Sequence, residues 1–121
     1  MNFGTKIKDL RINAQMTLRT FAKRLDIDAS NWSKIERGII PPPAPDSLME
    51  RITPILNLSM TDSRELQDLA AIDRKELPAD LQQNALLLSK MPAFFRAMKG
   101  REYTEGDLDR IIEGITKTNQ P

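Results

Sequence analysis

The sequence predicts an all-α protein, in which a five-helix head over residues 1–72 is followed by additional carboxy-terminal helices over residues 73–121. Apolar residues recur at the three- and four-residue spacing of one helix face, and no useful length of chain alternates as a strand does. Residues that favour helix amino termini, such as Thr17 and Asp28, precede these periodic segments. At 121 residues, the chain has the size of one domain with a small appendage.

Three short helices are predicted in the amino-terminal third. The first covers residues 3–13, the second follows Thr17, and the third follows Asp28 and ends at Gly38. The apolar faces of the three helices are, in order, Phe3, Ile7 and Leu10; Leu18, Phe21, Ala22 and Leu25; and Trp32 and Ile35.

Prolines organise the middle of the chain. Residues 39–45 cannot be helical, because each proline lacks an amide donor and biases the preceding residue toward extended backbone. The next helix is expected to open at Asp46 or Ser47, with Ser47 and Glu50 as a capping box, and Pro54 is expected to kink it or end it early. Further helical segments are marked by Asp62 and Glu65, by Leu77-Pro78 before residues 79–90, by Pro92 for residues 91–100, and by the cap Thr104.

The composition argues against an enzyme. The chain has no Cys and no His, which removes disulfides, thiol nucleophiles, Cys/His zinc sites and the commonest general acid or base. Its 17 carboxylates are scattered, and no glycine-rich phosphate loop accompanies them. We therefore expect no catalytic residues, no metal and no cofactor. Without a signal segment or a long apolar run, the expected location is the cytoplasm, with no membrane contact.

The charges are unevenly distributed along the chain. Residues 1–40 carry 8 basic and 4 acidic side chains, so their net charge is 8 − 4 = +4, whereas the remainder carries 10 − 13 = −3. A basic amino-terminal third favours contact with a polyanion, and an acidic remainder favours a different task, such as pairing with another chain.

The segment from Thr17 to Gly38 has the proportions of a helix-turn-helix. Residues 3 to about 58 resemble the Cro/C1-type (XRE) family of bacterial and phage repressors. The features that carry the resemblance are Arg11, Phe21-Ala22 and the ending Ile35-Glu36-Arg37-Gly38. The resemblance implies a lambda-repressor-like DNA-binding head, with a structural ion pair between Arg11 and Glu36.

Two turn positions depart from the family pattern. Gln15 and Asp26 stand where glycine is usual. Both residues are expected to adopt left-handed backbone, which Asp tolerates better than Gln.

The resemblance also implies which side chains meet DNA. A recognition helix over residues 28–37 would enter the major groove, because inward-facing Trp32 and Ile35 leave the opposite face open. The side chains expected to read bases are Ala29, Ser30, Ser33 and Lys34, of which Lys34 is the best donor to guanine. Those expected at phosphates are Thr17, Arg19, Lys23 and Arg37.

The predicted function is sequence-specific binding of double-stranded DNA by a transcriptional regulator, most simply a homodimeric repressor, since one helix-turn-helix makes a small interface. The alternative is an antitoxin-type interaction module that neutralises a partner protein and regulates its own operon. Residues 73–121 are rich in large apolar residues, so they can dimerise, bind a cognate toxin or protease, or cover their own head. The sequence leaves these three uses open.

Overall fold

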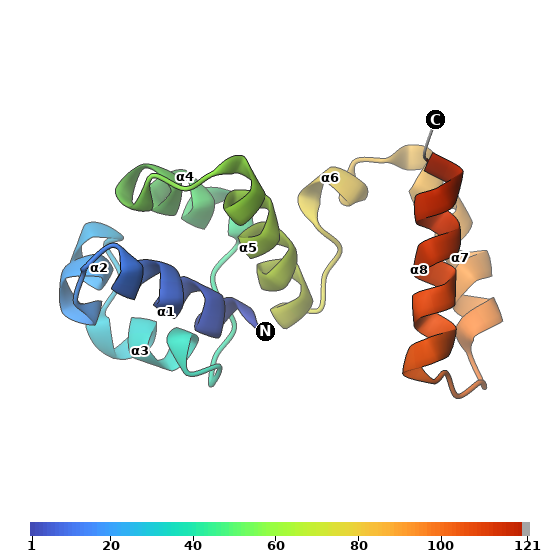
Figure 1. Cartoon of the computed structure of the whole chain (residues 1–121), viewed down its shortest axis with the longest axis horizontal. Helices are drawn as coiled ribbons and strands as arrows, with labels where there is room; N and C mark the ends of the chain where they lie inside the picture. The colour runs from blue at the N-terminus through green and yellow to red at the C-terminus, as the bar shows by residue number, and fades with distance from the viewer. Residues whose placement is uncertain (120–121) are drawn as a thin grey trace. The chain divides into compact units, whose positions relative to one another are not determined.

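The computed structural model describes residues 1–119 of the chain. This part contains eight α-helices and no strand, which confirms the all-α prediction (Figure 1). The helices are α1 (Phe3–Asn13), α2 (Leu18–Arg24), α3 (Ala29–Glu36), α4 (Pro45–Leu56), α5 (Met60–Asp73), α6 (Ala79–Gln82), α7 (Ala85–Met98) and α8 (Glu105–Asn119).

The chain forms two compact units. The first unit spans Met1–Asn84 and the second begins at Ala85. The short helix α6 therefore belongs to the first unit, whereas the boundary predicted from the sequence lies after residue 72. None of the helices within residues 1–119 combines the length and the apolar character that a bilayer crossing requires.

The amino-terminal helices begin and end where local capping chemistry predicts. The Thr17 side chain accepts a hydrogen bond from the Thr20 amide, and the Asp28 side chain accepts one from the Asn31 amide. Helix α1 spans Phe3–Asn13, as predicted, and the Asn2 side chain caps it. These oxygens satisfy amides that the first turn of a helix leaves without a backbone partner.

Trp32 lies at the centre of the core of the first unit. Its ring is fully buried and packs edge-on against Phe3 and Phe21, with ring centroids 6.4 and 5.5 Å away. Ile52 of α4 and Leu66 of α5 are fully buried in the same cluster. Burying side chains of this size contributes roughly 1.5–3 kcal/mol each. All five helices α1–α5 thus contribute to one core.

Polar contacts join distant parts of the same unit. The Lys6 ammonium on α1 lies 3.1 Å from Asp62 and 3.3 Å from Glu65, both on α5. Hydrogen bonds to these two carboxylates raise the pKa of Lys6 above 10.5. Arg74 donates to the carbonyl of the buried Pro42 at 3.1 Å, so the proline segment is held against the end of α5.

The predicted start of α4 is wrong. The helix begins at Pro45 and its N-cap is Ala44, with no side-chain cap, so Ser47 and Glu50 form no capping box. Proline suits this first position because its missing amide hydrogen would have no partner there. Pro54 lies inside the helix, which ends two residues later at Leu56, and the kink at Pro54 stays a prediction.

Two predicted breaks are placed differently in the structure. Pro92 was expected to begin a new segment but lies inside α7, which runs unbroken from Ala85 to Met98. The chain breaks earlier instead, between the end of α6 at Gln82 and Ala85, within the helix predicted over residues 79–90. A proline removes one helical hydrogen bond, and the good helix formers on both sides of Pro92 offset that loss.

The other helix starts agree more closely with the sequence. α5 begins two residues before Asp62, after the cap Ser59, which accepts from the Asp62 amide. Thr104 precedes α8 as predicted, and its hydroxyl accepts from the Asp107 amide while the Asp107 carboxylate accepts from the Thr104 amide, both at 3.1 Å. This reciprocal pair is a capping box.

The two non-glycine turn positions adopt the left-handed backbone that the sequence predicted. Gln15 has φ 61° and Asp26 has φ 58°. We expect Gln15→Gly to raise the free energy of unfolding by roughly 0.5–1 kcal/mol, since glycine relieves the steric cost of this conformation but gains entropy when unfolded. Urea denaturation measures the change. The adjacent Ala14 has φ −83°, so Ala14→Gly is the matched control and should lower stability; equal effects of both substitutions would contradict the prediction.

Candidate nucleic-acid interface

Helices α2 and α3 form a tight pair joined by residues 25–28 (Figure 1). The turn is held by the Ile27 amide, which donates to the Ala22 carbonyl at 3.0 Å, and by the left-handed Asp26. Ala22 is fully buried, so its small side chain allows the two helices to approach closely. The arrangement has the geometry of a helix-turn-helix.

Glu36 fixes the far end of α3 to α1. Its carboxylate accepts from Arg11 Nε at 2.8 Å and from Arg11 Nη2 at 3.0 Å, which is a two-pronged ion pair between the two expected partners. It also accepts from Trp32 Nε1 at 2.7 Å, a contact that was not predicted from the sequence. Arg11 donates further to the Met16 carbonyl at 2.8 Å. Both charged residues are buried, so these bonds satisfy groups that water cannot reach.

The opposite face of α3 is open to solvent. Ser30, Lys34 and Arg37 are exposed, and Ser33 is half-buried. Ala29 differs from the expectation that it faces outward, because it is half-buried and packs against the core of the first unit. The exposed side chains are short or basic, and the buried face of the same helix packs on the core and fixes their position.

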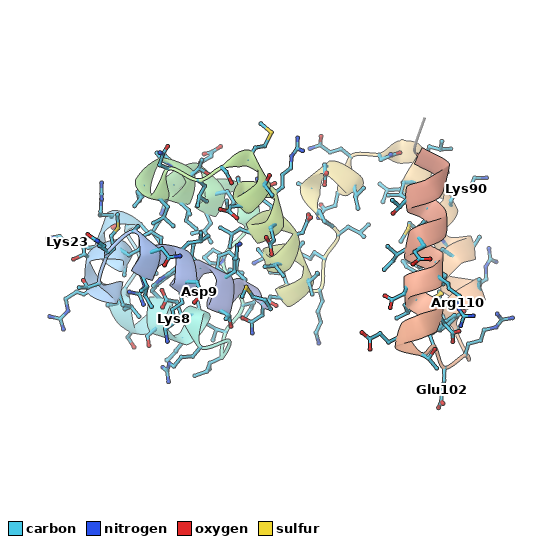
Figure 2. All side chains as sticks on the ribbon, viewed as in Figure 1. Lys8, Asp9, Lys23, Lys90, Glu102 and Arg110 are labelled. Atoms are coloured by element: carbon cyan, nitrogen blue, oxygen red, sulfur yellow. The ribbon has the colours of Figure 1, made fainter. Side chains whose placement is uncertain are left out.

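The residues expected at phosphates are also exposed. Arg19 and Lys23 extend from α2, and Figure 2 shows Lys23 at the outer edge of the first unit. The Thr17 hydroxyl is engaged locally, since it accepts from the Thr20 amide and donates to the Thr20 hydroxyl at 3.0 Å. Arg37 donates from Nε to the Ser33 carbonyl at 3.3 Å. This bond does not use the Nη1 and Nη2 groups, which can donate to a phosphate.

Two further polar residues lie on this surface and are not among the contacts predicted from the sequence. Asn31 is exposed on α3, next to the expected base-reading residues. Lys8 of α1 lines a hollow of about 200 Å³ together with Ser33 of α3 and Arg37, the residue that follows α3. Helical position alone could have identified Asn31, whereas the approach of Lys8 to α3 depends on the packing of α1.

A family model described as a helix-turn-helix domain matches residues 2–67, which are 66 of the 121 residues. The chain belongs to the helix-turn-helix domain family. The matched domain includes all of α1–α4 and most of α5, and it supports a DNA-binding regulator. No curated protein and no solved structure was found to match the chain.

Within residues 1–119, no group of three or more acidic, Cys or His side chains is arranged to hold a metal ion. Helix-turn-helix domains are typically binding modules, so the exposed face of α3 and its basic surroundings are the candidate site.

Proposed function

We propose that this helix-turn-helix protein is a sequence-specific transcriptional regulator of the Cro/C1 (XRE) type, acting as a homodimeric repressor without enzymatic activity. The observation that carries the proposal is the exposed face of α3, where Ser30 and Lys34 lie on a helix anchored by Trp32 and Glu36 and Arg37 follows its last turn. Small polar side chains on a fixed helix suit the major groove and add little to stability. The expected cytoplasmic location agrees with a protein that must reach DNA.

The two groups of side chains have different tasks in this proposal. Lys34 donates to guanine O6 or N7, and Ser30 and Ser33 bond to base edges. The methyl group of Ala29 is half-buried, so the one contact that it offers a base is an apolar contact with a thymine methyl. The groups that hold the DNA backbone in register are Thr17, Arg19, Lys23 and Arg37.

The test of this function is binding of the full-length protein to the DNA upstream of its own gene, at two salt concentrations and with random DNA as competitor. Binding that resists the competitor and weakens steeply with salt supports a specific regulator. Binding that random DNA displaces equally well speaks against an operator at that site.

Lys34→Ala is expected to weaken operator binding by about 1–3 kcal/mol and to relax base preference at one position in each half-site. The reason is that a lysine donor to a base edge discriminates among bases. Binding to a library of substituted operators measures the preference. Lys99→Ala, an exposed lysine in the second unit, is the control; uniform weakening across the library by Lys34→Ala would assign Lys34 to a phosphate instead.

Arg19→Ala is expected to weaken binding to all sequences alike and to reduce the slope of log affinity against log salt by about 1. A phosphate contact releases a bound counterion but carries no direct sequence information. Fluorescence anisotropy over a salt series measures the slope. A changed base preference with an unchanged slope would show that Arg19 reads a base.

A further inference from the structure

We infer that α7 and α8 pair with the same two helices of a second copy, so that two hairpins form a four-helix bundle that joins the chains. The inference rests on the proposed function, which needs two helix-turn-helix units, and it names the surface that joins them. The partner of this surface is a second copy of this chain and not an unrelated protein.

The first observation is that the second unit lacks a core of its own. α7 and α8 run antiparallel and are joined by residues 99–104 (Figure 1). No side chain within residues 85–116 is buried. A unit of fewer than about 40 residues usually needs a disulfide, a metal or oligomerisation to fold, and this chain has no Cys.

The second observation is one open apolar stripe on each helix. On α7 the half-buried Leu87, Met91 and Met98 are flanked by exposed apolar side chains, and α8 carries exposed ones at three- and four-residue spacing. Helices covered on only part of an apolar stripe are typical of one half of a four-helix bundle. The exposed members of the two stripes are Leu88, Phe94 and Phe95 on α7 and Leu108, Ile111, Ile112 and Ile115 on α8.

The size of this surface suits a dimer. The seven side chains are between 41% and 60% exposed. If each side chain has roughly 150–200 Å² of accessible surface when fully exposed, the exposed apolar surface is about 600 Å² per copy. A pair of copies would bury about 1,200 Å², which reaches the lower bound of specific interfaces.

Charge favours a second copy as the occupant. α7 carries Lys90 and Arg96 and no acidic residue, so its net charge is +2. α8 carries four acidic and two basic residues, so its net charge is 2 − 4 = −2. Lys90 borders the apolar stripe of α7, as Glu105, Asp107 and Asp109 border that of α8. A bundle that sets α7 of one copy beside α8 of the other therefore brings opposite charges together, as flanking charges do in coiled coils.

The first unit offers no matching apolar surface. Its exposed large apolar residues are single side chains from separate segments: Met1, Ile12, Ile39, Met60, Ile72 and Leu81. The acidic charge of the remainder also lies in this unit, because residues 41–84 carry 4 − 8 = −4 whereas residues 85–121 carry 6 − 5 = +1. The second unit is therefore nearly neutral, so two copies of it do not repel each other.

Sedimentation equilibrium of the full-length protein without DNA tests the inference. The expected mass is twice the 13.8 kDa of one chain. Ile112→Lys combined with Ile115→Lys is expected to raise the dimer dissociation constant by roughly 100-fold or more, since four buried isoleucines per dimer become charged. Ile12→Lys, an equivalent change on α1 at 51% exposure, is expected to leave it unchanged.

A charge exchange keeps the test informative if the lysine variant unfolds its own hairpin. One chain carries Lys90→Glu and Arg96→Glu, and the other carries Glu105→Lys and Asp109→Lys. Each chain alone is expected to self-associate at least about 10-fold more weakly, and an equimolar mixture is expected to form a heterodimer. Circular dichroism of each sample reports whether the helices are retained.

Three outcomes would overturn the inference. The first is a protein that stays monomeric at about 100 μM, a concentration far above the dissociation constant of a standard interface. The others are a dimer that Ile112→Lys with Ile115→Lys leaves intact, and charge-exchanged chains that do not pair. The readout is independent of the proposed function, because no DNA is present. An intact dimer that fails to bind DNA would count against the regulator, whereas a monomer that still contacts a half-site would count against the bundle alone.

Discussion

Replacing Glu36 with Ala is expected to lower the free energy of unfolding of the first unit by about 3–5 kcal/mol, the usual effect of removing one partner of a buried ion pair. The substitution leaves the Arg11 guanidinium buried without its carboxylate, because both residues are only 7% exposed. It also leaves Trp32 Nε1 without its acceptor at 2.7 Å. Urea denaturation followed by tryptophan fluorescence measures the loss, since Trp32 is the one tryptophan of the chain.

Two matched variants separate the sources of this loss. Glu36→Gln keeps the volume and an acceptor for Trp32 but removes the charge, so it should fall between the wild type and Glu36→Ala. Glu65→Ala removes a surface ion pair with Lys6, 3.3 Å away, and should cost no more than about 1 kcal/mol. A loss below about 1 kcal/mol for Glu36→Ala would contradict the role assigned to the buried pair.

Gly4→Ala is expected to lower the free energy of unfolding by about 1–3 kcal/mol or more, the range for overpacking a closed core. Gly4 lies in α1 where that helix crosses the end of α3, and it is buried. A methyl group at this position would lie 2.5 Å from the Ile35 carbonyl oxygen and would also collide with the Glu36 carbonyl. These are backbone atoms, so the two helices themselves would have to move apart.

The expected sign is opposite to that of helix propensity. Alanine is favoured over glycine inside a helix by about 1 kcal/mol, so the sequence alone would predict that Gly4→Ala stabilises α1. Gly114→Ala is the matched control, because a methyl group there meets no atom within 4 Å in α8. Thermal unfolding of both variants decides the matter; a Gly4→Ala protein as stable as the wild type would show that α1 and α3 are not held at this distance.

The pair of predictions shows which features depend on residues far apart in the chain. Arg11 and Glu36 are 25 residues apart, and a family resemblance was needed to connect them. Nothing in the sequence connects Gly4 with the end of α3. Lys8 lines the same hollow as Arg37 only because α1 packs against α3. Such approaches are set by how helices cross, which short-range spacing does not encode.

The sequence by itself determined the helical class, the bounds of α1, the caps at Thr17, Asp28 and Thr104, and the inward faces of the first three helices. These features depend on residues within about one turn of each other, where hydrogen bonding and helical period act directly. The family resemblance added that Gln15 and Asp26 are left-handed, because they stand at turn positions where glycine is usual.

Only the tertiary structure decided the rest. It kept Pro54 inside α4, turned Ala29 partly into the core, and gave Glu36 a second donor in Trp32. It also assigned α6 to the first unit and left α7 and α8 without buried side chains in residues 85–116. The physical reason is that local preferences of about 1–3 kcal/mol, such as that against an interior proline, yield when packing and helix contacts contribute more.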